Sequence, residues 1–386
     1  MSSEAYIVEA VRSPMGRAYK GQFANTRIDD VAAELIKFIM KKNPQLPPEI
    51  LEDLLLGCAM PEGEQGLNVA RNITLLAGLP LTIAAATVNR FCASSLTTLY
   101  MAAQNIQSEN ADAILAGGIE SMSHVPMGGF NPSLNPKLML PEAPAAYIGM
   151  GTTAENLARK YSISRDQQDQ FALTSHRKAT SAQQQGKFTN EICPIAATGF
   201  DGKTFLADKD EGPRADTTLE ALAKLKPAFE EKGTVTAGNS SPLTDGAAML
   251  LVVSKKILKK YKLQPLAKVK SFAVAGVDPA TMGIGPVPAV KKALERAGMK
   301  MKHLDLIEIN EAFAVQVLSC VKELEIDDKK LNVHGGAIAL GHPLGASGAR
   351  LTSTLVHAMH ERNVNVGLAT MCVGGGQGVA VILERV

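Results

Sequence analysis

The sequence has few cysteines, little net charge and no long apolar run. Its five cysteines form no Cys-x-x-Cys pair, which argues against a disulfide framework and a zinc ribbon, so we expect free thiols. A formal net charge of +2 gives no general attraction for nucleic acid. No apolar stretch reaches the length of a membrane span, and the first residues lack a secretory signal pattern. These absences predict a cytoplasmic protein with no metal site and no membrane association.

The length of the chain predicts more than one packed unit. At 386 residues it exceeds the size at which one hydrophobic core stops growing. With 46% hydrophobic and 20% charged residues, the composition is that of a soluble globular protein.

Short apolar runs alternate with helical patterns at both ends of the chain. Near the start, runs such as AYIVEAV and LEDLLLGC are separated by helix-like segments such as DDVAAELIKFIMKKN, an order typical of βαβ units. From about Pro265 a similar order returns, including AIALG, which we interpret as a strand, and the helix GARLTSTLVHAMHE. The sequence therefore predicts an α/β fold whose two ends are weak repeats of one unit.

The middle of the chain has a different pattern. From about Ser121 to Asp245, Pro, Asn, Gly and Met become dense and strand patterns fade. One helix is clear: Ser164 and Gln167 form a capping box, and Gly186 ends it. We interpret residues 121–245 as an inserted domain, residues 1–120 with 246–265 as one half, and residues 266–386 as the other.

Cys92 is the first candidate catalytic residue. It lies between an apolar strand and a helix whose apolar face carries Leu96, Leu99 and Ile106. The unpaired N–H groups and dipole of a helix N-terminus stabilise a thiolate, which is the nucleophilic form of cysteine. A buried structural cysteine is the alternative, because free cysteine is among the most buried residue types.

Three further segments carry candidate residues. His342 lies in a glycine-rich loop that leaves an imidazole room to act as a base for a thiol, or it is structural. Cys372 precedes the glycines that begin at Gly374, where N–H groups can form an oxyanion hole, or it too is structural. Asn310 follows a predicted strand, where it either caps the next helix or donates to an oxyanion.

Together these segments resemble the thiolase family. VNRFCASS resembles the nucleophile motif of that family, NEAF its asparagine loop, NVHGGAIALGHPLGASG its histidine motif and TMCVGGGQG its C-terminal cysteine motif. Likeness in RSPMGR, IESMSHVPM, MGTTAENLA, TLEALAKLKPAF and TAGNSSPLTDGAA extends the resemblance over nearly the whole chain. It is closest to the 3-ketoacyl-CoA thiolases that form the β subunit of bacterial fatty-acid oxidation complexes. It implies two βαβαβαββ halves in an α/β/α/β/α core with an inserted loop domain.

The resemblance also implies a role for each candidate residue. Cys92 would form an acyl-enzyme, His342 would take its proton, and Cys372 would exchange a proton with the acetyl-CoA leaving group. Asn310, through a water, and His342 would donate to the enolate oxygen. The backbone N–H groups of Cys92 and Gly374 would hold the oxyanion of the acyl-enzyme.

The same resemblance implies that coenzyme A is a co-substrate and that no cofactor is tightly bound. Arg214 would lie near the adenine nucleotide, with Ser241 and Met150 along the pantetheine, although Arg214 also fits a solvated loop charge. The family further implies a homodimer or homotetramer, and it is compatible with a complex with a multifunctional β-oxidation subunit.

The chain-length class and the reaction class have alternatives. Gly149 stands where members specific for acetoacetyl-CoA often carry His, which favours longer acyl chains, whereas Gly375 stands where fatty-acid oxidation members often carry Leu. An acetoacetyl-CoA thiolase is therefore one alternative. The others are a ketoacyl synthase, which Cys372 argues against, a hydrolase using Cys92, His342 and water, and a scaffold that binds acyl-CoA without catalysis.

Overall fold

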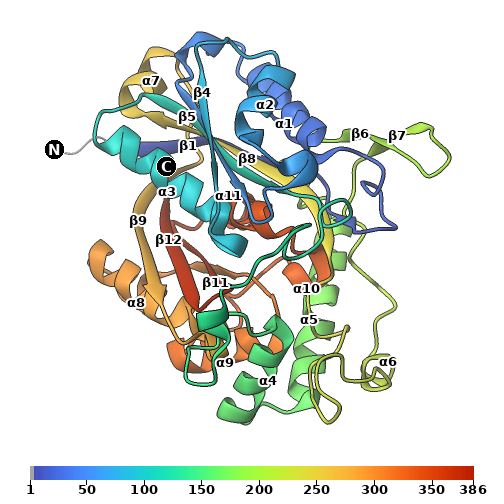
Figure 1. Cartoon of the computed structure of the whole chain (residues 1–386). Helices are drawn as coiled ribbons and strands as arrows, with labels where there is room; N and C mark the ends of the chain where they lie inside the picture. The colour runs from blue at the N-terminus through green and yellow to red at the C-terminus, as the bar shows by residue number, and fades with distance from the viewer. Residues whose placement is uncertain (1–3) are drawn as a thin grey trace.

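Five layers of secondary structure make up the fold of residues 4–386, which the computed structural model describes. The central layer holds α3 (Ser94–Gln107) and α11 (Ser347–Glu361), with strands on both sides of it and further helices outside the strands. In Figure 1 the blue N-terminal half lies above this layer and most of the orange and red C-terminal half lies below it. The layered α/β/α/β/α fold expected from the sequence is confirmed.

The N-terminal half follows the predicted order βαβαβαββ. Strand β3 runs parallel to its neighbours β4 and β5, and β8 pairs antiparallel with β1 and β5. The elements of this half are β1 (Ala5–Arg12), β2 (Gly16–Arg17), α1 (Ile28–Lys42), β3 (Asp53–Cys58), α2 (Val69–Leu76), β4 (Ala84–Val88), α3, β5 (Ala113–Glu120) and β8 (Thr244–Ser254).

The C-terminal half repeats this topology with one strand reduced. Where the first half has β4 at its edge, the second has a single parallel bridge between Ile307 and Leu331. Its elements are β9 (Ala267–Gly276), α8 (Pro286–Ala297), β10 (Leu306–Ile309), α9 (Ala314–Leu324), α10 (Ala337–Leu340), α11, β11 (Val366–Val373) and β12 (Gln377–Arg385). Short 3-10 turns lie at Pro48–Ile50, Gly63–Gln65, Phe91–Ala93 (η3), Pro136–Met139, Pro279–Ile284, Met301–His303 and Leu344–Ala346 (η7).

The strands of the two halves join at a narrow seam between β1 and β9. They follow the order β10-β11-β12-β9-β1-β8-β5-β3-β4, and within residues 4–386 β1 pairs with β9 at Tyr6–Lys268 and Ile7–Ala267. Away from this seam the central helices separate the strands. Successive side chains of a strand point to opposite faces, so each strand packs on both sides. Leu54 and Leu56 pack outward with residues of α1, whereas Leu55 packs inward with Leu99 of α3.

One local prediction from the sequence is wrong, and one of two alternatives is excluded. AIALG, predicted as a strand, contains the helical turn α10, and a buried apolar run of this length does not distinguish the two states. Asn310 is not a helix cap, because α9 begins at Ala314 with Phe313 at its N-cap. The intervening residues are extended instead: Phe313 forms a bridge with Ser240.

Residues 121–243 leave the sheet at the end of β5 and return at β8. They contain α4 (Met150–Tyr161), α5 (Arg165–Gln184), the hairpin of β6 (Ile195–Thr198) and β7 (Thr204–Ala207), and α6 (Leu219–Ala223). Only α5 was clear from the sequence, and its capping box is confirmed. Helices α4 to α6 lie in the green to yellow part of Figure 1, at the lower right. After β8, the lysine-rich segment begins with α7 (Lys255–Lys260).

Candidate active site

Cys92 lies in a tight turn between β4 and α3. The turn is η3, and Phe91 before it has a positive φ of 42°, a conformation that side chains rarely adopt. The side chain of Asn89 holds this conformation by accepting a hydrogen bond from the Phe91 N–H at 2.8 Å. The cysteine is partly exposed, and its own N–H and that of Gly374 lower the pKa of its thiol.

The thiol of Cys92 is protonated at neutral pH. Burial raises its pKa to about 11, even though the two backbone N–H groups lower it. Burial therefore outweighs the stabilisation of a thiolate that the sequence predicted from the helix N-terminus. A nucleophile in this state requires a base.

A second thiol lies beside the first. Cys372 is at the end of β11, and the glycine turn that begins at Gly374 connects β11 to β12, as the sequence predicted. Its side chain is buried against Ala154 and Leu157 of α4. Burial raises the pKa of Cys372 well above the ordinary range, and the neighbouring Cys92 raises it further. Cys372 therefore holds its proton, as an acid must before it donates.

His342 is buried, and its hydrogen bonds define which nitrogen is free. Its Nδ1 lies 2.6 Å from the hydroxyl of Ser347, and that hydroxyl donates to the Pro343 carbonyl at 2.9 Å. The hydroxyl proton is thus engaged, so Nδ1–H must donate to Ser347, which leaves Nε2 as an acceptor. Burial, assisted by Arg350, lowers the pKa of His342 to about 3, so the ring is neutral at neutral pH.

Asn310 contacts the imidazole directly. Its Nδ2 lies 3.4 Å from Nδ1 and 3.3 Å from Nε2 of His342, so the amide lies beside the ring rather than bonding one nitrogen alone. Its Oδ1 is buried and has no hydrogen-bond partner among the described residues. The backbone N–H of Asn310 donates to Thr370 of β11, which places it next to the strand that carries Cys372.

Packing brings the nucleophile and the base together. The η3 turn that contains Cys92 packs against β11 and against η7, which follows His342. Cys92 also packs in one apolar cluster with Leu344. Cys92 comes from the N-terminal half, whereas His342, Cys372 and Asn310 come from the C-terminal half. The site therefore forms only where the two halves meet.

The three residues expected along coenzyme A lie at different depths. Met150, at the start of α4, has its sulfur 3.5 Å from the position of a Cβ built on Gly374. Ser241 donates its N–H to the Ala312 carbonyl, two residues after Asn310. Met150 and Ser241 therefore adjoin the catalytic groups. Arg214, by contrast, is exposed on a separate loop.

Two residues that the sequence did not single out take part in the arrangement. Ser347 fixes the tautomer of His342, and its spacing of five residues from the histidine was the only available signal. His176 on α5 accepts a hydrogen bond at Nδ1 from the Arg214 N–H at 3.2 Å, and its Nε2 is buried without a partner among the described residues. Burial, with a contribution from Arg214, lowers the pKa of His176 to about 4.

Comparison with known proteins identifies the family. The profile of the N-terminal thiolase domain matches residues 5–256, and that of the C-terminal thiolase domain matches residues 263–385. The chain belongs to the thiolase family.

Individual thiolases support the same assignment over the full length. A 3-ketoacyl-CoA thiolase of Marinomonas sp. is 49% identical, covering 100% of this chain and 99% of the relative. One from Colwellia psychrerythraea is also 49% identical, covering 100% of both chains. The crystal structure of the Bacillus anthracis acetyl-CoA acetyltransferase superposes with a TM-score of 0.91 at 40% identity, covering 100% of this chain and 99% of that one.

Metal sites and membrane-spanning helices are absent from the described part of this thiolase. Within residues 4–386, no group of three or more His, Cys, Asp or Glu side chains is placed to hold a metal ion. Over the same part of the chain, no helix has both the length and the apolar character needed to span a bilayer.

Proposed function

We propose that this thiolase cleaves 3-ketoacyl-CoA with coenzyme A, giving acetyl-CoA and an acyl-CoA shortened by two carbons. The observation that carries this proposal is the pair of thiols: Cys92 and Cys372, one from each half, lie together beside a neutral imidazole. A hydrolase or a condensing enzyme with one catalytic cysteine has no need of the second thiol.

In the first half-reaction Cys92 attacks the 3-keto carbon. Its proton passes to Nε2 of His342, and the bond between C2 and C3 breaks. The electron pair of that bond moves to C2 and the thioester oxygen as an enolate. Cys372 then gives its proton to C2, which releases acetyl-CoA and leaves the acyl group on Cys92.

In the second half-reaction coenzyme A takes the acyl group. Its thiol gives a proton to the Cys372 thiolate, and its sulfur attacks the acyl carbon. Cys92 leaves as a thiolate and recovers its proton from His342. We assign the oxyanion of this step to the N–H groups of Cys92 and Gly374, since both favour negative charge at this position by lowering the pKa of the Cys92 thiol.

The enolate of the first step needs donors of its own. Asn310 lies beside the His342 ring, so we assign these two residues to the thioester oxygen. The unpartnered Oδ1 of Asn310 supports a bridging water there, because a buried amide oxygen without a hydrogen bond is costly.

Coenzyme A is the proposed co-substrate, bound without any tightly held cofactor. Met150 and Ser241 lie next to the catalytic groups and suit the pantetheine arm, and the exposed cation of Arg214 suits the nucleotide. Beside it, the buried Nε2–H of His176 offers a further donor.

The substrate class follows from the relatives. Those at 49% identity are named 3-ketoacyl-CoA thiolases. The second candidate is an acetoacetyl-CoA thiolase, which the likeness to an acetyl-CoA acetyltransferase favours.

One assay decides between these candidates. CoA-dependent loss of 3-ketoacyl-CoA absorbance is compared for a four-carbon and a longer-chain substrate. Faster cleavage of the longer chain supports the degradative enzyme, and preference for four carbons supports the alternative. Release of free acid in place of acyl-CoA would refute both.

We also propose that two copies associate through the edge strand β4. In the part of the chain that the structure describes, this strand pairs with β3 alone, and an open strand edge is a template for another chain. Leu81 beside it is 76% exposed and Phe91 is 41% exposed. Replacing Leu81 with Lys should shift the mass measured by light scattering to that of one chain, and an unchanged mass would contradict this interface.

We further propose that the protein works in the cytoplasm and as part of a larger assembly. A cytoplasmic location is supported by five free cysteines, because a reducing compartment keeps thiols unpaired. A larger assembly with a multifunctional β-oxidation subunit would bring the acyl-CoA substrate directly to this enzyme.

A further inference from the structure

Glu120, the last residue of β5, is a buried carboxylate surrounded by hydrogen-bond donors. Its Oε2 accepts from the N–H of Ala59 at 2.9 Å and of Gly345 at 2.8 Å. Its Oε1 accepts from the Met60 N–H at 3.2 Å and from Nε2 of Gln65 at 3.1 Å. Four N–H groups satisfy the acceptor capacity of an ionised carboxylate, whereas a protonated carboxyl would direct an O–H at one of them. Burial raises the pKa of Glu120, and these four donors oppose that rise because they stabilise the charged form.

The same carboxylate oxygen joins the two catalytic segments. Gly345 belongs to the loop that carries His342, three residues earlier in the chain. On the other side, the carbonyl of Ala59 accepts from the side chain of Asn89 at 3.0 Å. Asn89 in turn holds the strained backbone of Phe91, directly before Cys92. Hydrogen bonds thus run from Glu120 to Gly345 in the His342 loop and, through Ala59 and Asn89, to Phe91 directly before Cys92.

The histidine loop packs closely on the backbone of β5. A Cβ placed on Gly118 would lie 2.1 Å from the Gly345 carbonyl oxygen, and one placed on Gly345 would lie 2.6 Å from the Ile119 carbonyl oxygen. Neither a side chain nor a water fits between these segments. The loop therefore lies directly against β5, within reach of the hydrogen bond from Gly345 to Glu120.

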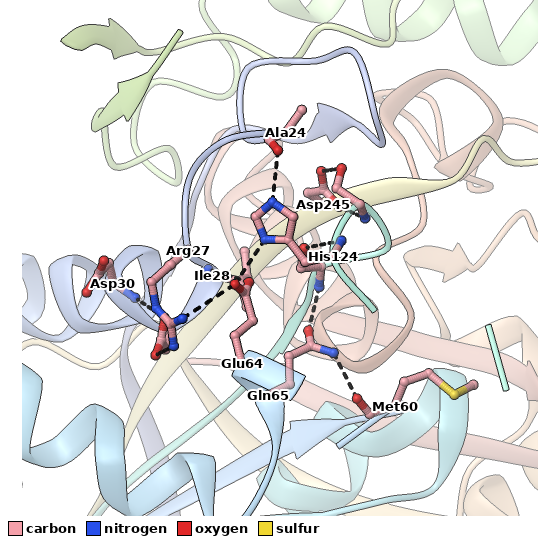
Figure 2. Close-up of polar contacts among 12 residues, drawn as sticks. Ala24, Arg27, Ile28, Asp30, Met60, Glu64, Gln65, His124 and Asp245 are labelled. Atoms are coloured by element: carbon pink, nitrogen blue, oxygen red, sulfur yellow. Dashed lines mark hydrogen bonds and ion pairs between the residues drawn. The ribbon is translucent and has the colours of Figure 1, made fainter. Parts of the chain in front are cut away.

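Gln65 fixes the carboxylate from the outer side. Its amide donates to the Met60 carbonyl at 2.9 Å and accepts from the Ser121 N–H at 2.5 Å. Figure 2 shows Gln65 beside Met60, with Glu64 directed away toward Arg27 and His124. Glu64 is thus a nearby partly buried carboxylate that contacts neither catalytic segment.

We propose that Glu120 is a positioning residue, which fixes the His342 loop relative to the turn that carries Cys92 and so aligns base and nucleophile. The alignment of base and nucleophile rests on the proposed function, whereas the relative position of the two segments does not. Glutamine keeps the size of this side chain but replaces an acceptor oxygen with an NH2 group facing two donors, so Glu120→Gln should displace one of the two segments.

Charge and position act in opposite directions in this variant. The negative charge of Glu120 raises the pKa of the Cys92 thiol, so loss of the charge alone would make Cys92 more reactive. Misalignment of His342 would instead slow acyl transfer. The direction of the change therefore separates a positioning role from an electrostatic one.

The experiment is a double-mutant cycle in the full-length protein. Glu120→Gln, His342→Ala and the double variant are compared for the rate at which an acyl-CoA acylates Cys92, with Glu64→Gln as the matched control. We expect Glu120→Gln to lower the acylation rate about 100-fold, the effect of a misplacement near 1 Å, with little change in KM. Adding His342→Ala should then cause no further loss, because both changes remove the same contribution. Glu64→Gln should keep the wild-type rate.

Hydrogen exchange gives a readout that needs no activity. In Glu120→Gln the amides of Ala59, Met60 and Gly345 should lose protection, while Glu64→Gln leaves them protected. Wild-type acylation without cleavage of any 3-ketoacyl-CoA would refute the proposed function and leave this inference standing.

Several results would overturn the inference itself. These are a wild-type or faster acylation rate in folded Glu120→Gln, additive losses in the cycle, unchanged protection of the three amides, or an equal loss in Glu64→Gln. If Glu120→Gln does not fold, Glu120→Asp gives the same cycle, because it keeps the charge but is too short to reach both segments.

Discussion

The hydroxyl of Ser347 accepts the Nδ1 proton of His342 at 2.6 Å and donates its own proton to the Pro343 carbonyl. This pair of hydrogen bonds leaves Nε2 as the free base.

Replacing Ser347 with Ala should lower kcat about 10- to 100-fold, because the imidazole keeps its basicity but loses its fixed tautomer and orientation. The measurement is steady-state cleavage of a 3-ketoacyl-CoA. Ser353 provides the control, since it lies on the same helix and its buried hydroxyl has no hydrogen-bond partner among the described residues. Equal losses in Ser347→Ala and Ser353→Ala would show that Ser347 has no specific role.

Removing each of the two thiols should block the reaction at a different step. Cys92→Ala removes the nucleophile, so neither an acyl-enzyme nor product should form. Cys372→Ala should still accept an acyl group from a simple acyl-CoA but should not break the carbon–carbon bond, because the acid for C2 is gone. Mass spectrometry of the acylated protein and the cleavage assay separate these steps. Cys193, a buried thiol outside the site, is the control, and normal cleavage by Cys372→Ala would remove that residue from the mechanism.

Alkylation of Cys92 should depend on pH in a way that reports its raised pKa. Because the pKa is about 11, iodoacetamide should react about tenfold faster with each added pH unit through the neutral range, without a plateau near pH 8.5. Labelling is followed by mass spectrometry at Cys92, with Cys92→Ala as the blank. A plateau at or below pH 8.5 would mean that the thiolate is the resting form.

His176 should make folding sensitive to acid. Its folded-state pKa of about 4 lies below the ordinary value of 6.5, so its contribution to stability is complete above pH 6.5 and is lost as the pH falls toward 4. In His176→Gln the free energy of unfolding should fall less steeply over this range, by roughly 1.4 kcal/mol per pH unit. Denaturant titrations at a fixed protein concentration give the slope. A wild-type slope in His176→Gln would contradict the shift.

Short-range patterns predicted much of this molecule. The apolar face of α3, the capping box at Ser164 and the glycine turn after Cys372 depend on neighbouring residues, so the sequence was sufficient for them. AIALG and the start of α9 were mispredicted because distant contacts decide both. Ser240 pairs with Phe313, and the Glu311 carboxylate accepts the N–H of Ile338 in α10.

In the candidate site, too, some features follow from short sequence patterns and others from distant contacts. Its reactive residues were identifiable because their types and motifs are distinctive. The partners of those residues were not, since the contact of Gly345 with Glu120 joins positions 225 residues apart in the chain. The raised pKa of Cys92 could not be predicted from the sequence either, because burial by the surrounding protein causes it.

The segment of residues 121–243 begins and ends at neighbouring points of the sheet. Glu120 and Gly246 are paired partners on β5 and β8. Because the entropy of closing a loop grows only with the logarithm of its length, this long segment costs on the order of 3 kcal/mol more to close than a tight hairpin turn. Loop-closure entropy therefore opposes insertions and deletions in this segment only weakly, and the limit comes from packing instead. Acyl and nucleotide preferences can be re-engineered there as long as α4 is kept, because Ala154 and Leu157 pack in one cluster with Cys372.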